Sequence, residues 1–193
     1  MDLLGALALI PVAMPLMGLI ALLIKATSPG PALFRQRRLG KGGTVFQLLK
    51  FRTMYHGRPQ AGSGLTQRGD SRITSVGRLL RRCKLDELPQ LFNVLRGEMS
   101  LVGPRPDLPV YFQGLNGELR RVLDLAPGIT GAASLKFRNE EALLAQIPPE
   151  QLESFYVKAL LPQKIELELE YARNASGFSD AAIVLRTAAA VFQ

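Results

Sequence analysis

Histidine, cysteine and tryptophan are nearly missing from this 193-residue chain, which has one histidine, one cysteine and no tryptophan. The lone Cys83 excludes an internal disulfide and is compatible with a reducing compartment. The lone His56 argues against a histidine-based triad and against a multi-histidine metal site. The sequence has no GxxxxGK[ST] loop and no GxGxxG after a strand, so the common nucleotide-binding loops are also missing.

Acidic residues are scarce in the first half of the chain, where none lies between Asp2 and Asp70. The formal net charge is +8, and residues 25–84 hold fourteen Lys or Arg against one acid. Such a surface attracts phosphate in nucleic acid, anionic lipid head groups or a phosphorylated small molecule. Nucleic acid is the weakest of the three, because the basic stretch has few aromatic residues to stack bases and no binding motif.

The chain opens with Leu3–Ile24, 22 residues without a charge, which at about 1.5 Å per residue just cross a hydrocarbon core of about 30 Å. Pro11 and Pro15 lie in its middle, and each removes a backbone donor. Two solutions remain open: a re-entrant helix-break-helix that returns to the same membrane face, or a kinked spanning helix. The basic residues between Lys25 and Lys41 predict that the following segment is cytoplasmic.

After this apolar segment, the pattern predicts a small β-hairpin followed mainly by helices. Residues 32–37 and 44–51 flank Gly40-Lys41-Gly42-Gly43 and are expected to form the hairpin, and residues 56–69 a polar loop. Helices are expected at residues 73–82, 89–95, 116–125 (capped), 149–161, 163–173 (after Pro162) and 179–192.

An acidic pair, Asp86-Glu87, stands just before the helix that Pro89 is expected to open. The ordinary interpretation is that the pair caps this helix and complements its dipole. Three features favour a second interpretation. Arg81 and Arg105 lie on either side of the pair, and arginine binds phosphate well. Mg²⁺ is usually held by one or two carboxylates together with substrate phosphates, and carboxylates can form aspartyl-phosphate intermediates. These features favour a site that handles a phosphorylated substrate at a lipid surface.

Five ordered segments resemble the bacterial sugar transferases, the monotopic phosphoglycosyl transferases. They are DELPQLFNVL (86–95), GEMSLVGPRP (97–106), KFRTM (50–54), PGITG (127–131) and the opening DLLGA (2–6) before a proline-broken apolar segment. The resemblance covers nearly the whole chain. It implies an α+β, mainly helical fold with a re-entrant anchor at 1–25 and a compact cytoplasmic catalytic domain at 26–193, with amphipathic surface helices around it.

The resemblance also implies an activity: transfer of a phospho-sugar from a nucleotide diphosphate sugar, usually a UDP-sugar, to polyprenol phosphate, with release of UMP. It implies a ping-pong mechanism at the cytoplasmic face of the bacterial inner membrane, through a covalent phospho-sugar on Asp86, with Glu87 helping to hold Mg²⁺. The implied partners are the nucleotide sugar, polyprenol phosphate and anionic lipids, and no nucleic acid. The remaining implied site residues are Lys50, Arg81, Arg105 and Asp180, with Pro11 and Pro15 at the membrane break.

Some assignments have ordinary competitors. Asp180 follows Ser179 at an expected helix start, so a capping role is as well supported as catalysis, and a phosphate contact for Arg138 is evenly balanced. The sequence departs from the family pattern at Met14, where serine is common, at Ala126, where arginine is common, and after residue 131. The alternative function is a non-catalytic basic scaffold at the membrane surface, which would need neither carboxylate.

Overall fold

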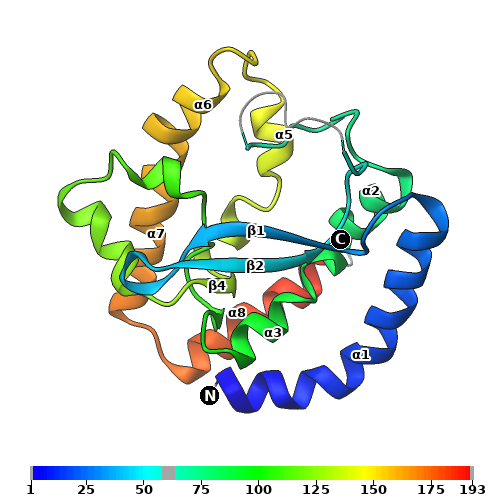
Figure 1. The fold of residues 1–193 in the computed structure, drawn as a ribbon. Helices are drawn as coiled ribbons and strands as arrows, with labels where there is room; N and C mark the ends of the chain where they lie inside the picture. The colour runs from blue at the N-terminus through cyan, green and yellow to red at the C-terminus, as the bar shows by residue number, and fades with distance from the viewer. Residues whose placement is uncertain (1, 58–63, 192–193) are drawn as a thin grey trace.

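The computed structural model describes residues 2–57 and 64–191, and its chain is mainly helical with two small sheets (Figure 1). The expected hairpin is confirmed: β1 (Leu33–Leu39) pairs antiparallel with β2 (Val45–Phe51) through a 3₁₀ turn at Lys41–Gly43. β3 (Ser100–Val102) and β4 (Gly128–Thr130) form a second, parallel pair that the sequence analysis did not anticipate. This pair brings the turn after β3 beside the loop after β4.

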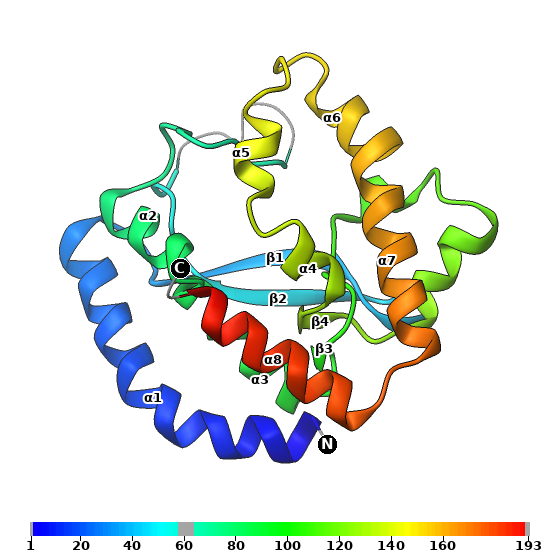
Figure 2. The ribbon, with the colours of Figure 1, turned by 180° about the vertical axis from the view of Figure 1, so that it is seen from behind.

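The helices surround the hairpin, which crosses the molecule from α1 and α2 at one end to α7 at the other (Figures 1 and 2). Their bounds, with those of the 3₁₀ and π segments, are α1 (Asp2–Thr27), α2 (Ser75–Arg82), η2 (Leu85–Glu87), α3 (Gln90–Leu95), η3 (Pro109–Phe112), η4 (Gly117–Asp124), α4 (Ala132–Lys136), α5 (Glu140–Leu144), α6 (Leu152–Phe155), η5 (Tyr156–Leu160), α7 (Leu161–Arg173) and α8 (Gly177–Val191).

The apolar N-terminal segment is one helix, not a helix interrupted at its prolines. α1 is long and apolar enough to cross a membrane, and it includes both Pro11 and Pro15. Figure 2 shows it bent, so that its two halves run in different directions. The predicted break is therefore corrected to a bend, because proline inside a helix removes single hydrogen bonds and kinks the axis without ending the helix.

One side of α1 packs along the rest of the molecule. Asp2 Oδ1 accepts a hydrogen bond of 3.2 Å from the Leu101 amide, Ala6 is buried with Phe46, and Ile24 is buried with Phe51. The other side is apolar and exposed, through Leu3, Leu4, Leu7, Leu9, Val12, Met14, Leu16, Leu19, Leu22 and Leu23. A helix with this exposed face needs an apolar environment.

The end of α1 is fixed to the hairpin by a buried arginine. Arg52, just after β2, donates from Nη2 to the carbonyl oxygen and the hydroxyl of Ser28, each at 2.8 Å. Gly30 has a φ of +111°, and a Cβ there would lie 2.4 Å from Arg52 Nη1, so this turn requires glycine. Arg52 thus joins the apolar helix to the strand that carries Lys50.

Two other expectations need correction. The capped helix expected at residues 116–125 is a 3₁₀ helix, η4 (Gly117–Asp124), with no side-chain cap from Asn116. The helices expected on either side of Pro162 are continuous, because α6 runs through a π-helical segment, η5, directly into α7. Pro162 lies in the first turn of α7, where wider π hydrogen bonding accommodates its missing N–H. Residues 58–63 of the expected polar loop lie outside the described residues.

We predict that Gly77→Ala destabilises the protein by about 3 kcal/mol, since overpacking of this kind costs that order. Gly77 is in α2, and a Cβ there would lie 2.0 Å from the backbone oxygen of Thr53. Thermal unfolding in detergent measures the change. Gly114→Ala is the matched control, because its Cβ meets nothing within 4 Å. An unfolding midpoint for Gly77→Ala equal to that of the control would show that α2 is free to move away from β2.

Candidate active site

The acidic pair lies in a tight turn between two helices. Lys84 adopts a left-handed conformation (φ 54°, ψ 16°), the one such non-glycine residue in the described chain, and the 3₁₀ turn η2 follows it. This reversal turns both carboxylates inward, with Asp86 6% and Glu87 8% exposed. Neither caps α3, whose N-cap position is Pro89 and carries no side-chain bond. The capping interpretation of the pair is therefore wrong.

Glu87 is bound by an arginine from the second sheet. Arg105 donates from Nη1 to Oε2 at 3.0 Å and from Nη2 to Oε1 at 2.6 Å, a bidentate pair that occupies both carboxylate oxygens. Arg105 reaches this position because β3 and β4 fix the turn between Gly103 and Pro106. Burial would raise the pKa of Glu87, but the attraction of Arg105 outweighs it and holds that pKa down at about 2.

Asp86 keeps one oxygen free. Its Oδ1 is buried and has no hydrogen-bond partner among the described residues. Burial raises the pKa of Asp86, Glu87 adds to the rise, and Lys50, Arg81 and Arg105 oppose it. A buried carboxylate with an unpartnered oxygen and three cations around it suits bonding to a positive centre such as phosphorus or a metal ion.

Lys50 brings a third positive group to the dyad from β2. Its register partner across the hairpin is Phe34, and its ammonium lies 5.6 Å from the centre of that ring. Burial, together with the like charges of Arg38 and Arg105, lowers the pKa of Lys50 to about 8 despite Glu87 and Asp86 nearby. Lys50 is thus a cation whose charge changes near neutral pH.

Arg81 faces the dyad from α2 but is held by another segment. It donates from Nε to Glu141 Oε1 at 3.0 Å, makes a second, shorter contact from Nη2 to the same oxygen, and lies 3.4 Å from Thr53 Oγ1. A phosphate that binds Arg81 has to displace or share the Glu141 carboxylate. No pattern in the sequence indicated this contact, because Glu141 is 60 residues away from Arg81.

The other two predicted site residues are placed differently. Arg138 is exposed between α4 and α5, beside Glu140 and Glu141. Asp180, in the first turn of α8, accepts a 2.6 Å hydrogen bond from the Tyr171 hydroxyl and thereby joins α8 to α7. The strongest electrostatic neighbours of Asp86 are Glu87, Lys50, Arg81 and Arg105, a set that does not include Asp180. A catalytic role for Asp180 or Arg138 stays a prediction.

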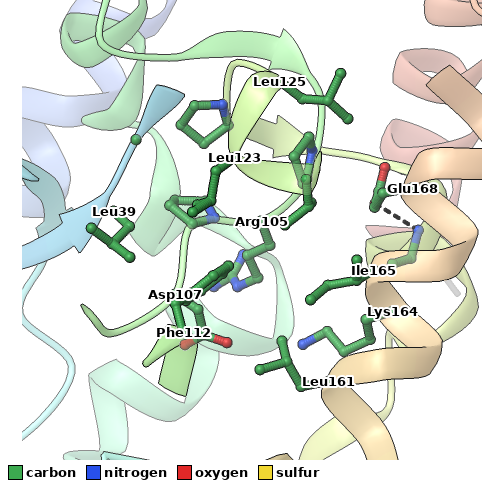
Figure 3. A pocket seen from close by; sticks show the side chains of 16 residues that line it. Leu39, Arg105, Asp107, Phe112, Leu123, Leu125, Leu161, Lys164, Ile165 and Glu168 are labelled. Carbon is green, nitrogen blue, oxygen red and sulfur yellow. Dashed lines mark hydrogen bonds between the residues drawn. The ribbon is translucent and has the colours of Figure 1, made fainter. Parts of the chain in front are cut away.

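A small cavity lies on the far side of Arg105, between its turn and α7 (Figure 3). Its volume of about 40 Å³ leaves room for a few waters and is too small for a sugar nucleotide. Glu168 lines it and accepts a 2.8 Å hydrogen bond from the Ala133 amide, just after the Pro-Gly-Ile-Thr-Gly loop.

The match between this chain and known sequences extends over its whole length. The model of the bacterial sugar transferase family matches residues 1–193. The chain belongs to this family. The resemblance that its five motifs indicated is therefore confirmed.

Two relatives illustrate what this bacterial sugar transferase is similar to. UDP-glucose:undecaprenyl-phosphate glucose-1-phosphate transferase of Caulobacter vibrioides is 41% identical over 190 residues, 97% of this chain and 66% of the relative. UDP-N-acetylgalactosamine-undecaprenyl-phosphate N-acetylgalactosaminephosphotransferase of Aeromonas hydrophila is 38% identical over 192 residues, 97% of this chain and 41% of the relative. The chain thus spans between about two fifths and two thirds of the length of these relatives.

For the transfer that the family resemblance implies, we predict that kcat/KM for the nucleotide-sugar donor falls as pH rises through about 8. Burial lowers the pKa of Lys50 to about that value, so the free enzyme loses the Lys50 charge there. Lys50→Arg keeps its charge and should move this alkaline limb to higher pH, because the guanidinium of arginine stays protonated well above the pKa of lysine. Initial rates of UMP release across pH measure both profiles. An alkaline limb that stays near pH 8 in an active Lys50→Arg variant would contradict the assignment.

Proposed function

We propose that this protein is a phosphoglycosyl transferase that moves a phospho-sugar from a UDP-sugar to polyprenol phosphate. The observation that carries the proposal is the free, buried oxygen of Asp86 among Lys50, Arg81 and Arg105. The two relatives above both transfer a sugar phosphate to undecaprenyl phosphate, and this supports the reaction class. Glucose in one relative and N-acetylgalactosamine in the other leave the sugar undetermined.

The proposed chemistry has two displacement steps. An Asp86 carboxylate oxygen attacks the phosphorus that bears the sugar, the bond from that phosphorus to the bridging oxygen of the diphosphate breaks, and UMP leaves with that oxygen. A phosphate oxygen of polyprenol phosphate then attacks the same phosphorus, which releases Asp86 and gives polyprenyl-diphosphate-sugar. Because the same carboxylate accepts the phospho-sugar in the first step and releases it in the second, the proposed mechanism is ping-pong.

The surrounding cations have distinct proposed roles. Lys50 and Arg81 bind the non-bridging oxygens of the donor diphosphate and stabilise charge as it develops. Arg105 holds Glu87 and offers its remaining exposed edge to phosphate, since 37% of its side chain is accessible. Arg138 is proposed to add a phosphate contact from the exposed turn before α5, and Asp180 to act through the α7–α8 contact.

The residues present fit a magnesium ion. No group of three or more potential ligands of the Asp, Glu, His or Cys type exists among the described residues, so the protein alone provides few ligands. That is the usual Mg²⁺ arrangement, with one or two carboxylates completed by substrate phosphates and water. Asp86 is the better ligand because its Oδ1 is free, whereas both oxygens of Glu87 are held by Arg105. A bound Mg²⁺ would neutralise part of the diphosphate charge.

α1 supports a re-entrant anchor with both ends on one membrane face. The helix of 26 residues is about 39 Å long at 1.5 Å per residue. A spanning orientation would carry one end across the bilayer, yet Asp2 and Ile24 both contact the catalytic part of the chain. We therefore propose that α1 lies bent in one leaflet of the bacterial inner membrane, with residues 26–193 on the cytoplasmic face and anionic lipids around them.

The competing function is a basic membrane-surface scaffold without catalysis. A scaffold gains nothing from burying two adjacent carboxylates, because burial of charge costs free energy unless partners compensate it. The bidentate contact of Glu87 and the free oxygen of Asp86 favour the enzyme. Nucleic acid is not a proposed partner, because the apolar face of α1 has no use in a nucleic-acid complex.

We predict that Asp86→Asn abolishes UMP release, with a loss of at least about a thousandfold, because the amide is a poor nucleophile at phosphorus. The assay uses protein in lipid nanodiscs with UDP-glucose, UDP-N-acetylgalactosamine or UDP-galactose, Mg²⁺ and undecaprenyl phosphate. Glu141→Gln is the matched control, since it removes a carboxylate beside Arg81 but not one of the dyad, and it should retain release. Full activity in Asp86→Asn would refute Asp86 as nucleophile.

We predict that a cysteine at position 2, in a Cys83→Ser background, reacts with a membrane-impermeant maleimide added from the cytoplasmic side. Inside-out and right-side-out vesicles separate the two faces, and mass spectrometry of the labelled protein measures the yield. Glu150→Cys, in the exposed turn before α6, reports the cytoplasmic face. Labelling of position 2 only from the side opposite to Glu150→Cys would mean that α1 spans the membrane.

A further inference from the structure

The residues that follow Arg105 are attached to the hairpin by a second arginine. Arg38, near the end of β1, donates from Nη1 to the Pro106 carbonyl oxygen at 3.2 Å and to Asp107 Oδ1 at 2.9 Å. The Leu39 amide donates to the Asp107 carbonyl oxygen at 3.2 Å. Three hydrogen bonds therefore connect β1 to the two residues directly after Arg105.

Arg38 is itself held in place from its other edge. Its Nη2 and Nε donate to Gln36 Oε1 at 2.7 and 3.2 Å. Gln36 and Arg38 lie two residues apart on β1, and the register places both on the face of the hairpin that also carries Lys50. The planar fork of Arg38 thus has a fixed orientation between Gln36 and Asp107.

Both oxygens of the Asp107 carboxylate are used. Oδ1 accepts from Arg38 and from the Leu108 amide at 2.9 Å, and Oδ2 accepts a short hydrogen bond from the Tyr156 hydroxyl. Tyr156 also accepts from Lys164 Nζ at 3.3 Å. Asp107 is 9% exposed and Tyr156 2% exposed, so this network is shielded from water.

The network separates two arginines that lie close together. Burial lowers the pKa of Arg38, Asp107 opposes this effect, and the like charge of Arg105 adds to it. Asp107 pairs with Arg38 and leaves the Arg105 fork to Glu87. Prolines on both sides of Arg105 fix the φ angle before and after it. The remaining motion of this turn therefore depends on the contacts that hold Asp107.

We propose that Asp107 is a positioning residue for the transfer reaction, and that its contacts with Arg38 and Tyr156 aim Arg105 at Glu87 and at the donor phosphate. The inference rests on the proposed function, because Arg105 meets a phosphate only if the chain is a transferase. Asp107 itself touches no reacting atom. Any effect of Asp107 on catalysis must therefore act through Arg105, so a substitution of Asp107 should lower activity only when Arg105 is present.

The test is a double-mutant cycle on kcat/KM for the donor, measured by UMP release. Asp107→Asn is expected to lower kcat/KM at least tenfold in the wild-type background and less than twofold in the Arg105→Ala background. Arg38→Lys should retain more activity than Arg38→Gln, because it keeps the charge that faces Asp107. Arg37→Gln is the matched control, on the same strand but on the exposed opposite face, and should leave kcat/KM unchanged.

Tyr156→Phe serves if Asp107→Asn unfolds, since it removes one hydroxyl and should lower kcat/KM severalfold, again only when Arg105 is present. Equal losses with and without Arg105 would overturn the inference and leave a merely structural role.

A crystal structure of the Asp107→Asn variant gives a readout that does not depend on activity. Displacement of the Arg105 guanidinium from Glu87 would show that Asp107 positions Arg105. Absence of UMP release from the wild-type protein would instead refute the proposed function, and with it the role of Asp107 in transfer. An undisturbed Arg105–Glu87 pair would overturn the inference.

Discussion

The bidentate ion pair between Glu87 and Arg105 connects the helix-breaking turn at residues 84–87 with the proline turn after β3. It gives the two adjacent carboxylates different properties. Glu87 is fully occupied and stays ionised, whereas Asp86 is buried with one oxygen free. A pair of acids in similar positions would otherwise repel each other and share protons. The asymmetry between the two acids, which the proposed chemistry at phosphorus uses, therefore comes from one arginine that binds only one of them.

The other two arginines near the dyad, Arg81 and Arg38, also form ion pairs with carboxylates. Glu141 holds Arg81, and Asp107 holds Arg38. Among residues 2–57 and 64–191, Lys50 has no carboxylate within 4.0 Å, and its pKa is about 8. In the proposed reaction, the donor phosphates therefore meet one cation without a carboxylate partner and have to compete with carboxylates for the others.

The sequence predicted the parts of this structure that depend on local patterns. The hairpin followed from two strand-like runs around a glycine-rich turn, and the dyad from its own motif beside Pro89. Bending of α1 at Pro11 and Pro15, instead of a break, depends on packing along its buried side, and the π segment before Pro162 has no local signature. The contacts of Arg81 with Glu141 and of Arg38 with Asp107 join residues 60 and 69 positions apart, which no periodicity in one sequence reveals.

The central claim is that a carboxylate oxygen of Asp86 becomes bonded to phosphorus during turnover. Acid quenching of the protein with UDP-sugar and Mg²⁺ in the absence of polyprenol phosphate, followed by peptide mass spectrometry, tests it directly. The account predicts that the mass of one sugar phosphate is added to the peptide that contains Asp86 and is lost again when polyprenol phosphate is supplied before the quench. An adduct on a different residue, or an active enzyme that forms no adduct under these conditions, would contradict it.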